Sequence, residues 1–345
     1  MRLATLVHSR AVLAVAALAV AAAGGVVTAW RTSAGPGAEP PAVAEQPSTT
    51  AAVTPTPSVP AATAKPSEPR RRPAPPLPRA GSLHPQPKPK PSAPATSAPV
   101  GGWPGAANTG WRHTGVSLTR FSCSAGVTEI TRPGTVVDGK DIRCGLLIRA
   151  DNVTVSRSRV VTGADVPIRT EDGRRGARIV DTEIDGSPGG CIAAIGYEGW
   201  TAIRVDIHGC GDGVRIENGS TLQDSWVHDF WDGTVNGQQV DDPHHDGAQS
   251  TGGSGLTIRH NRIDNPKDQT SCILVGGEFG APSNVLIENN YLNGGNYSIY
   301  LDPKGSNRVI RNNVFTRNYV YGPLRLEGTY TFTGNRYTDG APVTP

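Results

Sequence analysis

Three segments in the last third of the chain decide the fold: Leu256-Thr-Ile-Arg-His-Asn-Arg-Ile263, Val285-Leu-Ile-Glu-Asn-Asn-Tyr-Leu292 and Arg308-Val-Ile-Arg-Asn-Asn-Val-Phe315. In each, apolar residues alternate with polar ones on both sides of an Asn. This pattern is typical of two short β-strands joined by a bend. An Asn at the bend can hydrogen-bond to the Asn of the next unit. We expect four residues to act in this way: Asn261, Asn290, Asn313 and Asn335.

The same unit recurs through most of the chain. One equivalent apolar position falls at residues 155, 179, 202, 222, 258, 287, 310 and 332. A further short strand precedes each later unit, so that each repeat holds three strands. One such unit cannot bury its apolar face, whereas stacked units can. The repeats therefore predict an all-β fold, a parallel β-helix of about nine or ten coils.

Three stretches carry a family resemblance: Thr135-Val-Val-Asp-Gly-Lys140, Leu147-Ile-Arg-Ala-Asp-Asn-Val-Thr-Val155 and His245-Asp-Gly-Ala-Gln-Ser250. They are similar to secreted bacterial right-handed parallel β-helix proteins of the pectate-lyase-like superfamily, over roughly residues 112–345. The resemblance implies a right-handed helix. It leaves the activity open, because the superfamily contains uronate lyases, glycoside hydrolases, C5-epimerases and proteins of no known activity.

The sequence predicts three parts. Residues 11–30 carry no charge and lie between arginines, so residues 1–31 form either a cleaved signal peptide or a membrane signal anchor. Residues 32–110 form a disordered linker rich in Pro, Ala, Ser and Thr. Residues 111–345 form the β-helix. Either reading of the N-terminus places the β-helix in the extracellular space or at the cell surface.

The charge distribution bears on the partner. Residues 1–100 hold ten Lys/Arg and three Glu, whereas residues 101–345 hold 23 Lys/Arg and 27 Asp/Glu. A domain with this negative balance is a poor candidate for binding nucleic acid. We expect a polysaccharide partner, bound by a monomer.

All five cysteines lie in the part expected to be exported, where disulfides form readily. Cys191 and Cys210 occupy neighbouring positions of adjacent coils, about 4.8 Å apart, and are predicted to pair. Cys123 and Cys144 are predicted to pair near the N-terminal end of the helix. Cys272 is left over.

Strand alternation assigns two outward-facing columns of side chains on one face of the helix. We expect the outward ionisable and amide groups there to bind a sugar chain lying across the coils. The predicted substrate-binding residues are Arg215, Gln249, Arg325, His244, Asp302 and Lys304.

The longest insertion, residues 228–249, runs into this face. We assign His245 as the catalytic base, with Asp246 beside it and Tyr300 as the acid. A calcium ion is a candidate cofactor, held by Asp241, Asp242 or Asp246. Three aromatic residues in or next to the insertion are candidate platforms for sugar rings: Trp226, Phe230 and Trp231.

The insertion also carries a second resemblance. Asp242-Pro-His-His-Asp246 is similar to the Asp-Pro-His-Asp signature of parallel β-helix alginate C5-epimerases, from which it departs by one inserted residue. Either His244 or His245 is therefore a possible equivalent of the signature His.

Three functions follow as expectations. The first is a lyase or C5-epimerase that removes the C5 proton of a uronate-containing polysaccharide. The second is a glycoside hydrolase that uses Asp241, Asp242 or Asp246. The third is a non-catalytic module that binds carbohydrate or cell wall.

Overall fold

The structure, a computed structural model, describes residues 102–240, 244–266 and 270–345, all within the unit Pro87–Pro345. The predicted signal segment and nearly all of the predicted linker lie outside these residues. No helix among the described residues is long and apolar enough to cross a membrane.

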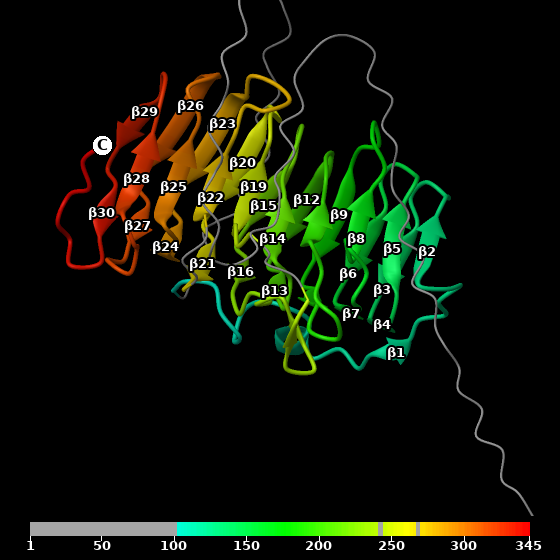
Figure 1. Ribbon diagram of the computed structural model, residues 1–345. Helices are drawn as coiled ribbons and strands as arrows, with labels where there is room; N and C mark the ends of the chain where they lie inside the picture. The colour runs from blue at the N-terminus through cyan, green and yellow to red at the C-terminus, as the bar shows by residue number, and fades with distance from the viewer. Residues whose placement is uncertain (1–101, 241–243, 267–269) are drawn as a thin grey trace, which may run out of the picture. The chain divides into compact units, whose positions relative to one another are not determined.

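The described residues form three long parallel sheets and one small hairpin (Figure 1). Sheet 1 contains β2 (Val127–Ile130), β5 (Gly145–Ile148), β8 (Ile168–Thr170), β11 (Ala193–Gly196), β14 (Asp212–Arg215), β19 (Ala248–Ser250), β22 (Ser271–Val275), β25 (Tyr297–Leu301) and β28 (Gly322–Leu326). Sheet 2 contains β3 (Val136–Asp138), β6 (Thr154–Ser156), β9 (Ala177–Val180), β12 (Trp200–Ile203), β15 (Thr221–Gln223), β20 (Leu256–Arg259), β23 (Ser283–Glu288), β26 (Ser306–Arg311) and β29 (Thr331–Thr333). Sheet 3 contains β1 (Thr119–Arg120), β4 (Lys140–Ile142), β7 (Arg159–Val161), β10 (Glu183–Asp185), β13 (Asp206–His208), β16 (Trp226–Val227), β21 (Arg262–Asn265), β24 (Tyr291–Gly294), β27 (Val314–Phe315) and β30 (Arg336–Tyr337). The remaining elements are the hairpin of β17 (Thr234–Val235) with β18 (Gln238–Gln239), and a 3₁₀ turn, η1 (Arg112–Thr114).

The chain visits the sheets in turn and so builds a right-handed parallel β-helix, as expected from the repeats for the fold and from the family resemblance for its hand. The predicted register is confirmed strand by strand. In sheet 2, Leu222 pairs with Ile258, Ile258 with Ile287 and Ile287 with Ile310. These residues are buried in a core that is continuous along the stack. The apolar interior that one coil cannot enclose is thus closed by its neighbours.

The predicted Asn stack holds one corner of the coils. The Asn261 backbone N–H donates to Asn290 Oδ1 (3.0 Å), and the Asn290 and Asn313 N–H groups donate in the same way to the next Asn, ending at Asn335. Each side-chain amide also donates to a backbone carbonyl of the preceding coil. All four side chains are buried, so the stack satisfies polar groups that water cannot reach.

Each stacked residue follows a residue in the left-handed conformation. His260, Asn289 and Asn312 have φ angles of 49°, 54° and 57°, and Gly334 has 65°. Asn and Gly tolerate this region better than most residues. The sharp bend at this corner is therefore marked in the sequence by a residue that tolerates positive φ directly before each stacked Asn.

Both predicted disulfides are present, Cys123–Cys144 and Cys191–Cys210, and Cys272 is a buried free thiol. The Cα atoms of Cys191 and Cys210 lie 4.5 Å apart, which matches their position in adjacent coils.

Residues 102–115 form a strap across sheet 3. Trp103 stacks on His260, the Gly110 N–H donates to the Arg204 carbonyl, and Trp111 Nε1 donates to Glu183. The predicted boundary at residue 110 is therefore too late, because residues 102–110 already belong to the folded part.

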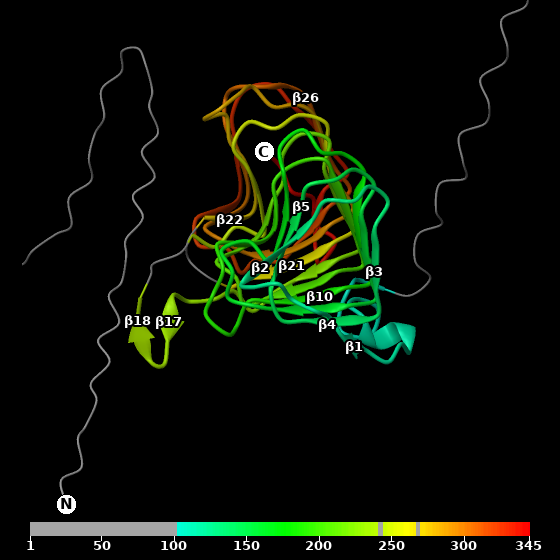
Figure 2. The ribbon, with the colours of Figure 1, turned by 90° about the vertical axis from the view of Figure 1, so that its right-hand side faces the viewer.

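The long insertion leaves the stack between β16 and β19. Its antiparallel hairpin, β17–β18, stands away from the coils when the helix is viewed along its axis (Figure 2).

Candidate functional site

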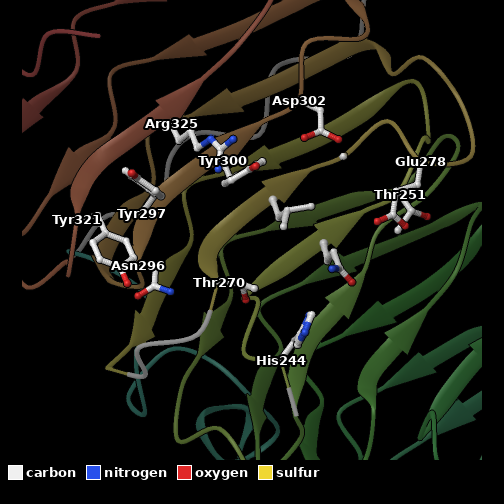
Figure 3. Close-up of a pocket in the computed structure, with 13 residues that line it drawn as sticks. His244, Thr251, Thr270, Glu278, Asn296, Tyr297, Tyr300, Asp302, Tyr321 and Arg325 are labelled. Atoms are coloured by element: carbon white, nitrogen blue, oxygen red, sulfur yellow. The ribbon is translucent and has the colours of Figure 1, made fainter. Parts of the chain in front are cut away.

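A groove of about 400 Å³ lies on the outer face of sheet 1, over β19, β22, β25 and β28 (Figure 3). Successive coils contribute equivalent residues, so the groove is lined by three parallel columns. The columns are an edge column before the strands, a middle column on the strands and a far column where the strands end.

The edge column holds Thr270, Asn296 and Tyr321, one from each of three coils. The Asn296 N–H donates to the Thr270 carbonyl, and the Tyr321 N–H donates to the Asn296 carbonyl. The Tyr297 ring lies beside them, with its centroid 5.7 Å from that of Tyr321. Tyr321 is 69% exposed. This side of the groove therefore offers aromatic surface and an amide together.

The middle column holds Gln249, Leu274, Tyr300 and Arg325, in the register predicted from the sequence. The Arg325 guanidinium lies 4.7 Å from the centre of the Tyr300 ring and pairs with Glu327 at 3.1 Å. Burial raises the pKa of Tyr300, although the charge of Arg325 opposes this shift. The phenol is therefore protonated at neutral pH and can donate a proton.

The far column holds Thr251 and Asp302, with Glu278 in the adjoining turn. Asp302 Oδ2 accepts a hydrogen bond from the Gly277 N–H at 2.8 Å. Lys304 Nζ donates to the Gly277 carbonyl at 3.1 Å. Lys304 thus holds the turn at the rim and does not line the groove, which corrects its predicted role in substrate binding.

The two histidines of the insertion lie on opposite sides of the chain. His244 is exposed and lines the groove. His245 is 6% exposed, and its Nε2 lies 2.9 Å from the Trp231 carbonyl oxygen. The expected alternation is present, but its phase is the reverse of the prediction. We therefore transfer the predicted role of base from His245 to His244.

Residues 190–341 match the family model described as "Right handed beta helix region". Domains of this kind occur in polysaccharide-active proteins. No curated protein and no solved structure matches the chain significantly. The matched residues include every residue that lines the groove.

Asp246 lies inside the protein, fully buried, which corrects its assignment to a catalytic surface. Its carboxylate accepts hydrogen bonds from Ser271, and its own N–H donates to Asp212 Oδ1 at 2.9 Å. Burial, and then the charge of Asp246, raises the pKa of Asp212 to about 7. Burial also raises the pKa of Asp246. The two aspartates stack from coil to coil, so their role is structural.

A repeated dipeptide marks this buried column in the sequence. Asp212-Gly213 and Asp246-Gly247 are equivalent, and a Cβ at either glycine would meet backbone of the next coil at 2.3 to 2.5 Å. Both glycines are therefore required by close packing. Reading this repeat would have assigned Asp246 to the stack.

Arg215 lies in the middle column, one coil beyond the groove. It pairs with Gln249 in the strand ladder, but its guanidinium lies 2.6 Å from Asp212 Oδ2. Arg215 thus balances the buried aspartates, and it is absent from the groove lining. Asp241 and Asp242, the predicted calcium ligands, lie outside the described residues.

The three predicted aromatic platforms are not in the groove. Phe230 is buried, Trp226 belongs to sheet 3, and the ring of Trp231 fills the space beside Gly190. The tyrosines of the edge and middle columns take their place. Tyr297, at the start of the strand that holds Tyr300, and Tyr321, just before the next strand of the sheet, were missed as groove residues.

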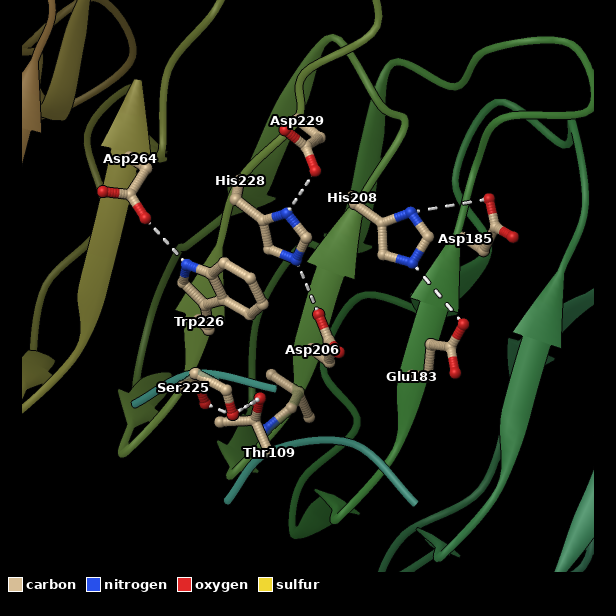
Figure 4. A network of polar contacts seen from close by, with 12 residues as sticks. Thr109, Glu183, Asp185, Asp206, His208, Ser225, Trp226, His228, Asp229 and Asp264 are labelled. Carbon is tan, nitrogen blue, oxygen red and sulfur yellow. Dashed lines mark hydrogen bonds and ion pairs between the residues drawn. The ribbon is translucent and has the colours of Figure 1, made fainter. Parts of the chain in front are cut away.

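A second polar region, also missed, covers the outer face of sheet 3 (Figure 4). We call it the sheet 3 network. Its members are Glu183, Asp185, Asp206, His208, Trp226, His228, Asp229 and Asp264. It combines carboxylates with imidazoles, the chemistry expected of a catalytic or metal site.

The sheet 3 network is, however, internally paired. His228 lies 2.8 Å from both Asp206 and Asp229. Its ring stacks on Trp226 with centroids 3.5 Å apart. Trp226 Nε1 donates to Asp264.

Glu183, Asp185 and His208 have ligand atoms close enough together to hold a metal ion. The negative charge of Glu183 is nevertheless already balanced, because Glu183 pairs with both Arg112 and Arg159. Burial alone would raise the pKa of Glu183, but the hydrogen bond from His208 and the two arginines lower it to about 2. We assign this group to the stability of the fold.

Proposed function

We propose that the protein acts on a uronate-containing polysaccharide by removing the C5 proton, as a lyase or a C5-epimerase. One observation carries the proposal. A single groove is lined by an exposed imidazole, a protonated phenol and a guanidinium, from His244, Tyr300 and Arg325. These are the three kinds of group that the reaction needs.

The C5 proton is acidic only when the negative charge that develops on the adjacent carboxyl group is neutralised. Arg325 supplies a positive charge at the groove, beside the ring of Tyr300. A guanidinium can bind a carboxylate through two parallel hydrogen bonds. Stabilising a charge as it develops is commonly a large contribution to catalysis.

His244 is the proposed base, since imidazole exchanges protons near neutral pH. It takes the proton from C5 and leaves the electron pair on the carboxyl-stabilised carbon. In a lyase, this pair forms the C4–C5 double bond as the C4–O bond breaks, and Tyr300 protonates the leaving oxygen. In an epimerase, Tyr300 returns a proton to the opposite face of C5.

A glycoside hydrolase is the second candidate. Asp302 and Glu278 both line the far side of the groove, and hydrolysis requires a pair of carboxyl groups. Burial removes Asp246 from the predicted set, whereas Asp241 and Asp242 stay predictions.

We further propose that the protein works outside the cytoplasm, as a secreted or anchored monomer of the pectate-lyase-like superfamily. The two disulfides support this compartment, because disulfides persist in oxidising surroundings. A calcium ion on Asp241 and Asp242 stays a prediction.

The test incubates the full chain with a panel of uronate-containing polysaccharides, with added Ca²⁺ and with a chelator. Absorbance of unsaturated uronates indicates elimination, and incorporation of deuterium from the solvent at C5 indicates epimerisation. New reducing ends without absorbance indicate hydrolysis. If binding occurs without any of these products, the proposed chemistry is wrong.

The Tyr300→Phe variant tests the role of the phenol. It keeps the ring beneath Arg325 and removes only the hydroxyl group. We expect a loss of rate of about 10²- to 10⁴-fold with little change in binding. An unchanged rate would contradict the assignment of Tyr300 as the acid.

A further inference from the structure

The groove contains a buried amide oxygen that accepts no hydrogen bond from the described residues. Gln249 is only 7% exposed, and its Oε1 accepts no hydrogen bond from any described residue. It lines the groove from the middle column. A buried amide without a partner is costly, so a native structure that keeps one calls for an explanation.

Asn296 repeats this feature at the edge of the same groove. Its Oδ1 is also buried without a hydrogen bond from the described residues. The Thr270 hydroxyl and the Tyr297 ring line the groove beside it. The groove thus carries two amides whose acceptor atoms take no hydrogen bond from the described residues, and one of them, Asn296, lies next to the Tyr297 ring.

This combination selects the chemistry of a ligand. A free amide oxygen needs a donor, which the hydroxyl groups of a sugar supply and a carboxylate does not; the charges of the groove then decide between a neutral sugar and a uronate. The hydroxyl groups of an uncharged sugar can donate to the amide oxygens and accept from the amide nitrogens. The apolar face of the same sugar ring can pack on Tyr297 or Tyr321.

The charges of the groove agree with this selection. Its lining carries one guanidinium, on Arg325, and two carboxylates, on Asp302 and Glu278. Glu327 already pairs with Arg325. A homopolymer of uronates would bring a carboxylate with every residue and would meet repulsion on the far column.

We propose that Gln249 and, two coils away, Asn296 with Tyr297 line a subsite for neutral sugar residues, next to the position of the uronate. The substrate is then a heteropolysaccharide in which neutral residues flank uronates. This inference rests on the proposed function only for the position of the uronate. The subsite for neutral sugars concerns binding and does not depend on turnover.

The test measures binding to the full chain by calorimetry. The two ligands are oligosaccharides of equal length, one built from a repeating uronate–hexose disaccharide and the other an oligogalacturonate. We expect the mixed oligosaccharide to bind at least ten-fold more tightly. Equal affinities, or tighter binding of oligogalacturonate, would overturn the inference.

Two substitutions locate the subsite. Gln249→Ala and Asn296→Ala should each weaken binding of the mixed oligosaccharide by about 3- to 10-fold, as expected for one lost hydrogen bond. Binding of oligogalacturonate should not change. The matched control is Gln238→Ala, an exposed glutamine on the hairpin, which should leave both affinities unchanged. If neither groove variant weakens binding, the assignment of the subsite is wrong.

The two proposals fail separately. Preferential binding of the mixed oligosaccharide without turnover would refute the proposed chemistry and keep the subsite. Rapid turnover of oligogalacturonate, unaffected by Gln249→Ala, would keep the chemistry and refute the subsite.

Discussion

The polar groups on the outer faces of sheet 1 and sheet 3 differ in whether they have hydrogen-bonding or ion-pair partners. On sheet 3, histidines and carboxylates lie within 2.8 to 3.7 Å of one another and are partly covered by the strap. On sheet 1, the groove has fewer charges but keeps buried amide oxygens that accept no hydrogen bond from the described residues. A high density of ionisable residues thus marks the stabilised face, whereas unmet hydrogen-bonding capacity marks the face where we propose that a ligand binds.

The largest expected effect separates the histidines of the two faces. His244→Ala should reduce turnover of the substrate by about 10²- to 10⁴-fold, since it removes the proposed base. His228→Ala should leave turnover within about two-fold, because His228 is bound to Asp206 and Asp229 on the other face. Initial rates of both variants give the answer. A loss of rate in a His228→Ala variant that still folds would contradict the assignment of catalysis to sheet 1 alone.

The next effect concerns the sheet 3 network alone. Glu183→Gln should lower the free energy of unfolding by about 3 kcal/mol, because it leaves the cations around a buried carboxylate without their partner. Urea unfolding measures this change. Asp339→Asn, in the exposed pair with Arg317, is the control and should unfold like wild type. A stable Glu183→Gln protein would show that the network contributes little.

Two buried carboxyls, Glu183 of sheet 3 and Asp212 of sheet 1, should also respond to pH with opposite signs. The pKa of Glu183 falls from 4.5 to about 2 on folding, so its contribution to stability is lost as pH drops through that range. The pKa of Asp212 rises from 3.8 to about 7, so folding is most favoured below pH 4 and stability declines as pH rises toward 7. Unfolding free energies measured across pH 2 to 8 should show a shallower acid-side decline in Glu183→Gln, since other carboxyls with a lowered pKa, such as Asp138, keep the rest. Asp212→Asn should show a shallower decline between pH 4 and pH 7, and a slope equal to that of wild type would contradict the assignment.

The smallest effect tests the strap. Trp103→Ala should cost about 1 kcal/mol, since it removes the stacking on His260 and Tyr291. Thermal unfolding measures the change, and the initial rate of the same variant should equal that of wild type. An altered rate would mean that the strap communicates with the groove.

The fold could be predicted because its determinants are local and repeated. Alternation around Asn261 and Asn290 assigns the inward and outward side chains, and the spacing of the repeats assigns the register. The middle column of the groove follows from that register alone, from Gln249 to Arg325. Each of these conclusions depends only on how a coil pairs with the coil next to it.

The edge of the groove could not be predicted in this way. His244 to Gly247 form the corner before β19, which begins at Ala248, and strand alternation does not extend through a corner. Counting back from Gln249 therefore pointed His245 outward, whereas the structure buries it. Thr270, Asn296 and Tyr321 also lie in corners of variable length, where the pairing of strands carries no information about orientation.

The strap has a mechanical consequence. It enters the domain beside His260 and Tyr291, crosses Arg204 and Glu183, and reaches β1 only at the far end of the stack. A pull on the residues before 102 therefore loads the side of the stack and not its first coil. The aromatic stack of Trp103 would peel away first, and the anchoring of Trp111 and Arg112 on Glu183 would resist next. The strap can therefore detach before any coil is unwound.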